Sequence, residues 1–380
     1  MVVWKLDDIL KKKDISRIIS ELQTRVSKLE KKKKSFKPTM STKSFRAIME
    51  ELEHIDRALS KLGSYASNWF SENTKNQEAA ALRNHYRALS ADVETSLLFV
   101  GQEWKRFDNK NAQRLMKACP EYTHHLKLIR AGKKHMLSDE VEEIITIKDI
   151  NGPGALTTIY SMLTTGFSYE LNGKKVEPSE LIQHIRSSNG SMRRKSYNSL
   201  FKPYVAHKEV LAEMYKHIID DWRREANMRK YPRSISVRNR ANDLPDAAVA
   251  TLLKVCRKNA KVFQVYFKKK AKLLGKKKLS RYDLYAPLKK NNEKLSWKDA
   301  TETILQTFSD FHPDFYGAAS HIIEQEHIHS KVQANKHNGA YCNSPAPDCL
   351  PYILLSFTDD ANSMRTLAHE LGHGVHAVLA

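Results

Sequence analysis

The sequence predicts a mainly α-helical protein with a small β-sheet near the C-terminal end of the chain. Glycine, which weakens helix interiors, supplies only 13 of the 380 residues. Apolar residues recur three and four positions apart over most of the chain, and this spacing places them along one face of a helix. Runs in which apolar and polar residues alternate, as in a half-buried strand, are few.

Helices are predicted along the first two thirds of the chain. A lysine-rich amphipathic helix is expected within residues 1–35, and further helices from residue 41 to about residue 98. Helical spacing returns from residue 192 to 230 and from residue 243 to 274, while Ser138 and the acids after it mark another helix start. The apolar stripe of the first helix consists of Ile15, Ile18, Ile19, Leu22 and Val26.

Strands are predicted in three places. Phe167–Leu171 followed by Asn172-Gly173 indicates a short hairpin, because Asn-Gly fits the tight turn between antiparallel strands. Asn338–Cys342 and Leu350–Phe357 are rich in aromatic and aliphatic residues, which favour strands. Asp359–Asn362 then provides a cap for a final helix. The apolar stripe of that helix comprises Met364, Leu367, Ala368, Leu371, Val375 and Leu379.

The final helix carries the pattern His-Glu-Leu-Gly-His, which is typical of zinc peptidases. A spacing of four places His369 and His373 on one helix face, about 40° apart around the axis and about 6 Å along it. Both imidazoles can therefore bind one zinc ion. Glu370 lies beside the metal without binding it, where it can accept a proton from the water that zinc activates.

The residues around the His-Glu-Leu-Gly-His pattern make a chance match less plausible. Three fixed residues of this kind coincide roughly 0.04 times in a chain of this composition. A helix cap before the motif and an apolar stripe opposite it favour a metal site. Gly372 and Gly374 each cost the helix about 1 kcal/mol relative to alanine, so we expect another backbone to approach closely there.

A third protein ligand is needed for a catalytic zinc site. The metzincin pattern, with a third histidine ten residues after the first, is excluded because position 379 is Leu and position 376 is His. The remaining alternative is a glutamate on a later helix, which we expect beyond Ala380. The chain is therefore interpreted as the N-terminal part of a longer enzyme whose catalytic domain is incomplete.

Two other clusters are weaker candidates for metal binding. Cys342 and Cys349 are separated by a gap that matches no zinc site. A cluster of acids and histidines precedes the predicted strand at residue 338, and we interpret it mainly as the polar face and end of a helix. Its members are Glu324, Glu326, His327, His329 and His337.

Composition limits the class of protein. The chain has 64 basic and 43 acidic residues, a net charge of +21. Its basic runs are dispersed and mostly lysine, without the arginines and aromatic residues that read or stack on bases, so no nucleic-acid partner is expected.

No stretch has the ~20 apolar residues of a membrane-spanning helix. A charged N-terminus and four cysteines favour a cytoplasmic protein with reduced thiols and no membrane partner.

Taken together, these segments resemble the oligoendopeptidase F family, in the thimet oligopeptidase group of zinc peptidases. The most specific matches are Asn338–Cys342, Leu350–Phe357 and Thr366–His376. Upstream, Leu279–Pro287 and the stretch from Met192 to Arg233 are also similar to the family.

The resemblance implies a largely helical, two-lobed metallopeptidase with a small sheet next to the metal-binding helix and a channel that admits short peptides. It implies three parts: an N-terminal helical region (1–115), a small oligopeptidase F-type domain (116–185) and the zinc peptidase domain (192–380). His369 and His373 are the implied zinc ligands and Glu370 the general base. Gly339-Ala340-Tyr341 is the implied edge strand that binds substrate backbone.

The sequence therefore predicts a cytoplasmic zinc endopeptidase that hydrolyses internal bonds of short peptides. Because its third ligand is expected outside this chain, the 380 residues alone are expected to be inactive. One alternative is a metallopeptidase-like protein that binds peptides without cleaving them. Another is a basic nucleic-acid-binding protein in which the motif arose by chance. The sequence does not specify the oligomeric state.

Overall fold

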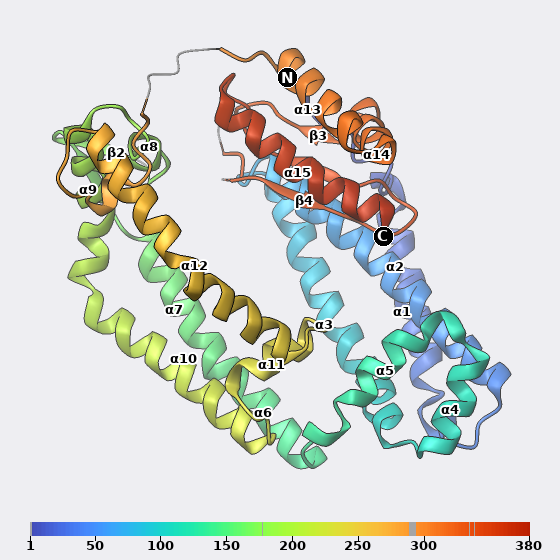
Figure 1. The fold of residues 1–380 in the computed structure, drawn as a ribbon. Coiled ribbons are helices and arrows are strands. Elements are labelled where there is room, and N and C mark those ends of the chain that lie inside the picture. Colours follow the sequence, from blue (N-terminus) through green and yellow to red (C-terminus); the bar gives the residue numbers. More distant parts are fainter. Residues whose placement is uncertain (1, 177, 289–293, 334, 338) are drawn as a thin grey trace. The chain divides into compact units, whose positions relative to one another are not determined.

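The computed structural model describes residues 2–176, 178–288, 294–333, 335–337 and 339–380. The chain forms two compact units, and the first of them is discontinuous in sequence (Figure 1). Unit 1 comprises Met1–Arg130 and Asn292–Ala380, and unit 2 comprises Ala131–Asn291. Both are built mainly from helices, as the sequence predicts.

Unit 1 begins with helices that pack against one another around a large apolar core. Side-chain caps start several of them: Ser41 Oγ accepts a hydrogen bond from the Ser44 amide, and Asn76 Oδ1 accepts one from the Ala79 amide. These helices are α1 (Ile15–Glu30), α2 (Thr42–Glu72), α3 (Gln77–Arg106), α4 (Asn109–Ala118) and α5 (Thr123–Ala131). The C-terminal part of the unit adds α13 (Trp297–Phe311), α14 (Pro313–Glu324) and α15 (Ala361–Leu379).

Three short strands form the sheet of unit 1. The central strand β5 (Tyr352–Leu354) is parallel to β3 (Ile328–His329) and antiparallel to β4 (Tyr341–Asn343). Both strands of the C-terminal segment that the sequence predicts are present, although they are shorter than predicted, and Asn338 lies outside the described residues. Strand β3 was not predicted.

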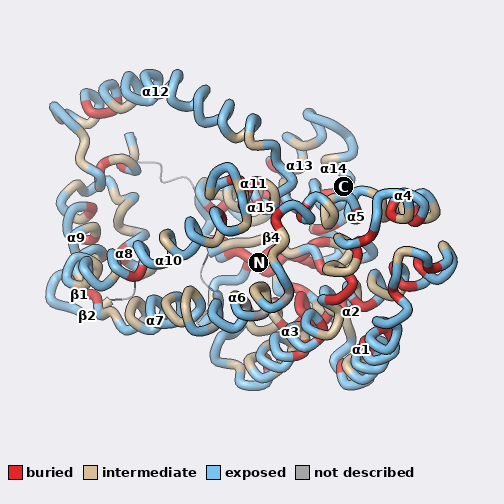
Figure 2. The backbone as a smooth tube through the Cα atoms, turned by 90° about the horizontal axis from the view of Figure 1, so that it is seen from below, coloured by how far each residue is buried: buried red, intermediate tan, exposed pale blue. Residues whose placement is uncertain are grey.

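The two faces of β5 belong to different cores. Tyr352 and Leu354 are fully buried in the core that the N-terminal helices form. Ile353, which points the other way, is buried with residues of α13, α14 and α15. A strand alternates its side chains between faces, so this three-residue strand joins the two cores of unit 1. In Figure 2 the buried residues of unit 1 are concentrated along α2 and around the sheet.

Unit 2 contains the predicted hairpin. Its strands β1 (Tyr169–Leu171) and β2 (Lys174–Val176) are joined by Asn172 and Gly173, whose φ angles are 52° and 81°. Positive φ at both turn positions is what the Asn-Gly pair supplies, so the hairpin prediction is confirmed. The helices of the unit are α6 (Asp139–Asn151), α7 (Pro153–Thr165), α8 (Pro178–His184), α9 (Gly190–Ala206), α10 (Lys208–Met228), α11 (Ser234–Ala241) and α12 (Asp246–Leu273).

A buried ion pair in unit 2 joins α9 to the 3-10 turn at Arg281–Asp283. The guanidinium of Arg193 donates to Asp283 Oδ1 at 2.8 Å, and both side chains are almost fully buried. None of the described helices is both long enough and apolar enough to cross a membrane. The 3-10 turns are Lys12–Asp14, Lys33–Ser35, Pro120–Tyr122, Lys133–His135 and Arg281–Asp283.

Candidate active site

Helix α15 begins and packs as its sequence predicts. Asp360 Oδ1 accepts a hydrogen bond from the Ser363 amide at 2.7 Å, which caps the first turn. Leu367, Leu371 and Val375 of the predicted apolar stripe are buried against α14 and the sheet. Leu379 is an exception: its side chain is 51% exposed, because the last turn extends beyond this core.

The two histidines of the motif face each other on the exposed side of α15. The Nε2 atoms of His369 and His373 lie 3.2 Å apart, and the rings are nearly perpendicular. Two nitrogens that each bind one tetrahedral zinc ion at ~2.0–2.1 Å are separated by about 3.3 Å. The observed separation therefore fits a shared zinc ligand pair, and both imidazoles are accessible from solvent.

Glu370 lies on the adjacent, buried face of the helix, toward the sheet. Its side chain is only 7% exposed, and among the described residues no hydrogen bond or ion pair engages its carboxylate. The nearest strand is β4, where burial and the Glu370 charge raise the pKa of the Cys342 thiol to about 12. Glu370 directly follows His369 in α15, and its carboxylate acts on Cys342 of β4.

The glycines of the motif have different environments. A Cβ at Gly374 would lie 2.8 Å from Ile322 Cδ1, so α14 approaches α15 closely at this point. The approach is made by a side chain, not by a backbone as we expected. At Gly372 a Cβ would meet nothing within 4 Å, so the predicted close approach is wrong there.

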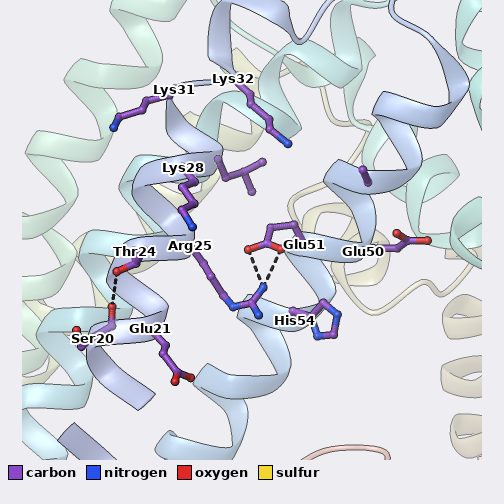
Figure 3. A pocket seen from close by; sticks show the side chains of 12 residues that line it. Ser20, Glu21, Thr24, Arg25, Lys28, Lys31, Lys32, Glu50, Glu51 and His54 are labelled. Atoms are coloured by element: carbon purple, nitrogen blue, oxygen red, sulfur yellow. Dashed lines mark hydrogen bonds and ion pairs between the residues drawn. The ribbon is translucent and has the colours of Figure 1, made fainter. Parts of the chain in front are cut away.

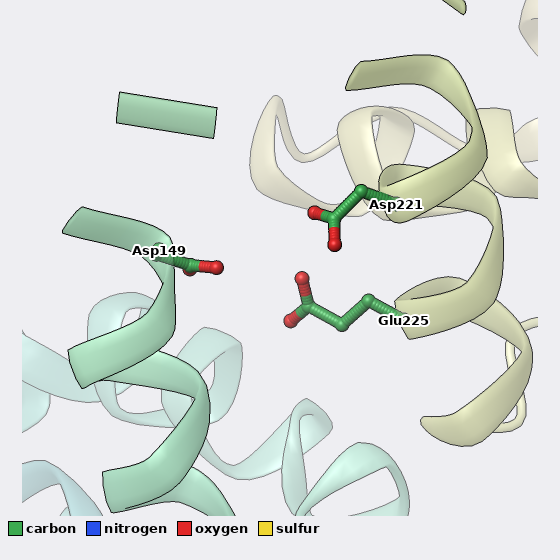
Figure 4. Close-up of side chains that lie close together, drawn as sticks. All are labelled: Asp149, Asp221 and Glu225. Atoms are coloured by element: carbon green, nitrogen blue, oxygen red, sulfur yellow. The ribbon is translucent and has the colours of Figure 1, made fainter. Parts of the chain in front are cut away.

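The described residues offer no third histidine, cysteine or carboxylate to the pair His369 and His373. In this part of the chain one group of three possible ligands occurs, namely Asp149, Asp221 and Glu225 in unit 2 (Figure 4). Its carboxylates are partly exposed, and Arg229 forms an ion pair with Glu225. An exposed acidic cluster of this kind needs no metal to explain it.

The second predicted cluster does not form a metal site, because its members have separate partners. Glu324 accepts a hydrogen bond from Ser320, and Glu326 pairs with Lys5. His327 Nε2 lies 3.2 Å from Asp8 Oδ2. The ring of His329 contacts Trp4, and the ring of His337 contacts Tyr341.

The interpretation of this cluster as a helix face and end holds only in part. Helix α14 does end at Glu324. His327 and His329, however, are buried, with 3% and 1% of their surface exposed. His327 directly precedes β3 and His329 is its last residue, whereas His337 is exposed. Sequence periodicity missed this strand because it is only two residues long.

Of the implied substrate strand Gly339-Ala340-Tyr341, only Tyr341 lies in a strand of the sheet. Tyr341 lies in β4, which pairs only with β5 among the described strands. Gly339 and Ala340 precede the strand, and Gly339 has a φ of 94°, a conformation that favours glycine. The side chain of Tyr341 points to α2, where its hydroxyl donates a hydrogen bond to Asn68 Oδ1.

A further surface groove lies elsewhere in unit 1. It has a volume of about 1010 Å³ and runs between α1 and α2 (Figure 3). Its charged side chains are partly paired, since the guanidinium of Arg25 contacts both carboxylate oxygens of Glu51. His54 is the one histidine among the described residues that line the groove, so it has no histidine pair like that on α15.

Two known family models match this chain. The model of peptidase family M3 matches residues 183–380, which include α15 and the sheet, and the oligopeptidase F model matches residues 103–167. The chain belongs to peptidase family M3. The predicted resemblance to the oligoendopeptidase F group is thereby confirmed.

Curated relatives of this M3 chain are distant in sequence. Oligopeptidase PepF of Bacillus subtilis is 22% identical over 392 aligned positions, which cover 98% of this chain and 57% of the relative. The oligoendopeptidase F homolog of Borreliella burgdorferi is 24% identical, with 92% of this chain and 59% of the relative covered. The M3 chain therefore spans less than two thirds of the length of these relatives.

Solved structures share the fold of this M3 chain. A crystal structure of a Chlamydophila abortus protein superposes with a TM-score of 0.77 at 19% identity, covering 98% of this chain and 64% of that one. Oligoendopeptidase-F from Enterococcus faecium gives a TM-score of 0.61 at 20% identity, covering 83% and 62%. The mainly helical fold class is confirmed.

Proposed function

We propose that this chain carries the metal-binding helix of a zinc-dependent metalloendopeptidase that hydrolyses internal bonds of short oligopeptides. The single observation that carries the proposal is the separation of 3.2 Å between the Nε2 atoms of His369 and His373. It matches what two nitrogen ligands of one tetrahedral ion require. His369 and His373 would hold the zinc ion.

When bound there, zinc would polarise the scissile carbonyl and lower the pKa of a coordinated water toward ~7. Glu370 would then take the proton of the attacking water and pass it to the leaving amine. Its position supports this role, because Glu370 follows His369 directly and precedes His373 by three residues on α15, and the carboxylate has no competing partner among the described residues. Burial of this side chain also limits its access to bulk water.

The substrates we propose are short, unstructured peptides in the cytoplasm. The proposal is supported by membership in the M3 family and by the names of the relatives. It is also supported by one edge of β4, which pairs with no other described strand and can pair with an extended backbone. Gly339, Ala340 and Tyr341 would line the path of that backbone. Cleavage assays with quenched peptides of increasing length and with a native globular protein test this point: efficient digestion of the folded protein would contradict it.

A third protein ligand would come from outside the described residues. The proposal rests on the finding that these residues supply two ligands to the site, whereas catalytic zinc sites in proteins usually have three. The same finding favours a second candidate function, namely peptide binding without cleavage.

Zinc content and turnover separate the two functions. The enzyme is expected to contain one zinc per chain when extended to the length of its relatives, and to lose both zinc and activity when His369 or His373 is replaced by alanine. A His85→Ala variant is the matched control, because this histidine is exposed and lies on α3, outside the metal-binding helix and the edge strand. Peptide binding with no turnover in a zinc-loaded extended chain would support the binding function instead.

A further inference from the structure

Lys336 places a buried ammonium group at one end of the small sheet of unit 1. The residue is only 8% exposed, although lysine side chains are rarely buried without partners. Its Nζ donates hydrogen bonds to three backbone carbonyl groups, as many as an ammonium has N–H donors. The acceptors are the oxygens of His329 at 3.1 Å, Lys331 at 2.8 Å and Leu355 at 2.6 Å.

Two of these carbonyl groups lie where a pair of parallel strands ends. His329 is the last residue of β3, and Leu355 directly follows β5. The amide of Leu355 donates a hydrogen bond to the His329 carbonyl at 3.0 Å. The same carbonyl accepts from Lys336, so the ammonium links both strands at the end of their pairing.

The backbone on either side of Lys336 is bound to the C-terminal end of α2. The carbonyl of Asn335 accepts hydrogen bonds from the amide and the hydroxyl of Thr74, at 2.8 and 3.0 Å. The amide of His337 donates to the Ser71 carbonyl at 2.9 Å. Residues 335–337 are therefore attached twice, to α2 through their backbone and to the sheet through the side chain of Lys336.

The charge of Lys336 is costly in this environment, and a second charge offsets part of the cost. Burial lowers the pKa of Lys336 to about 8, whereas the negative charge of Glu72, the last residue of α2, raises it. The carboxylate of Glu72 accepts a hydrogen bond from Trp4 Nε1. The ammonium form therefore prevails at pH 7, and all of its donors are used within the protein.

The segment that contains Lys336 leads into the edge strand of the sheet. Strand β4 begins five residues later at Tyr341, which pairs with Leu354 of β5. Leu355, whose carbonyl accepts from Lys336, is the next residue after Leu354. The ammonium and the ladder between β4 and β5 thus hold the two ends of one short connection to the same strand.

We propose that Lys336 is a positioning residue for substrate: it holds residues 335–337 against the ends of β3 and β5, and thereby sets where β4 presents its free edge. The inference rests on the peptidase function proposed above. Lys336 acts through β4 and does not contact the peptide, because its ammonium is buried and fully hydrogen-bonded. A peptide that pairs with β4 needs backbone donors and acceptors at a fixed spacing, so a displaced strand binds it more weakly.

The first test is independent of catalysis. Lys336→Met retains a long side chain but removes the charge and the donors. Hydrogen–deuterium exchange of the 380-residue variant, followed by mass spectrometry of peptides that cover residues 335–337 and 341–343, is expected to be about tenfold faster than in the parent. Lys331→Met, the same change at an exposed lysine of the same segment, is the matched control and should leave exchange unchanged. Unchanged exchange in Lys336→Met would overturn the proposal, whether or not the protein is a peptidase.

The second test measures cleavage of a quenched peptide by the zinc-loaded chain of full length. In Lys336→Met the KM is expected to rise about tenfold while kcat stays within about twofold, because a displaced edge strand weakens binding of the ground state and the transition state alike. Lys336→Arg keeps a cation with several donors and is expected to recover most of the loss. Lys270→Met is the control for loss of a buried lysine: this residue is 7% exposed and donates to the Leu284 carbonyl in unit 2. Its replacement is expected to lower stability but to leave KM unchanged.

Failure of the peptidase function and failure of this inference have different signatures. A zinc-loaded parent that neither binds nor cleaves peptides contradicts the peptidase function, and with it any role of Lys336 toward substrate. In an active parent, the positioning role is overturned by an unchanged KM in Lys336→Met, by a fall in kcat alone, by an equal rise of KM in Lys270→Met, or by no recovery with arginine. If Lys336→Met does not fold, Lys336→Gln, which keeps two donors, takes its place with an expected rise of KM of about threefold.

Discussion

Ile322 of α14 closes directly on Gly374 of α15, with 2.8 Å between the isoleucine Cδ1 and the place where a Cβ would be. Ile322 is fully buried, so its side chain has little space into which it can move. The contact fixes the distance between the two helices at the turn that follows His373. Because Gly374 lacks a Cβ, Ile322 can pack directly against the backbone of the helix that carries the histidines.

A glycine-to-alanine pair tests this contact. Gly374→Ala is expected to lower the free energy of unfolding by about 1–2 kcal/mol, because overpacking in a core costs ~1–3 kcal/mol and the gain in helix propensity offsets up to ~1 kcal/mol. Gly372→Ala, in the same helix but with nothing within 4 Å of the added methyl group, is expected to be neutral or slightly stabilising. Urea denaturation of the metal-free proteins gives both values, and equal effects at the two positions would contradict the packing argument.

Glu370→Gln in the zinc-loaded chain of full length is expected to retain zinc but to lose nearly all turnover. The amide is almost isosteric with the carboxylate but does not accept the proton. Metal analysis and cleavage of a quenched peptide measure the two properties separately. Glu324→Gln, on the exposed end of α14, is the control and should leave turnover unchanged. Near-normal rates in Glu370→Gln would remove this residue from the role of base.

Acid is expected to destabilise unit 1 through His329. Burial, with a smaller contribution from the positive charge of Lys336, lowers the pKa of His329 to about 4 from an ordinary value of 6.5. Between these values the unfolded chain binds more protons than the folded chain at this residue, so stability falls as the pH falls from 6.5 to about 4. His329→Leu should reduce this slope, whereas His337→Leu, at an exposed histidine, should not. Denaturation midpoints measured across this pH range, compared pairwise with the wild type, test the assignment.

The 380-residue chain by itself is expected to bind zinc weakly and to show little or no peptidase activity. The described residues provide two ligands to the site, and catalytic zinc usually has three protein ligands. Equilibrium dialysis and peptide cleavage should be compared between this chain and one extended to the length of its relatives. If the short chain holds one zinc tightly and turns over like the long chain, the third ligand lies within these 380 residues.

The sequence predicted the strongly periodic or strongly patterned parts of the molecule. Helix α15, its Asp360 cap and the Asn172-Gly173 turn follow from local chemistry, because capping and positive φ depend on a few neighbouring residues. The facing arrangement of His369 and His373 follows from their spacing on one helix.

Other features depend on contacts that are distant in sequence and could not be predicted in this way. Strand β3 has only two residues, too few for any periodicity, and is defined by its pairing with β5. The hydrogen bonds that Asn68 Oδ1 accepts from Tyr341 and Asn343 form only because β4 lies beside α2. Sequence position gives no indication that an asparagine of α2 lies beside β4.

The central position of β5 has a consequence for the order of events during synthesis. Helices α1 to α5 are complete by Ala131, but Tyr352 and Leu354, which are buried among them, emerge more than two hundred residues later. At ~5–20 residues per second the ribosome needs roughly 10–45 s to reach them. During this interval the apolar surface that these two side chains later cover has no native partner. The nascent N-terminal helices are therefore expected to need a chaperone, or to exist as a loosely packed intermediate, until the sheet forms.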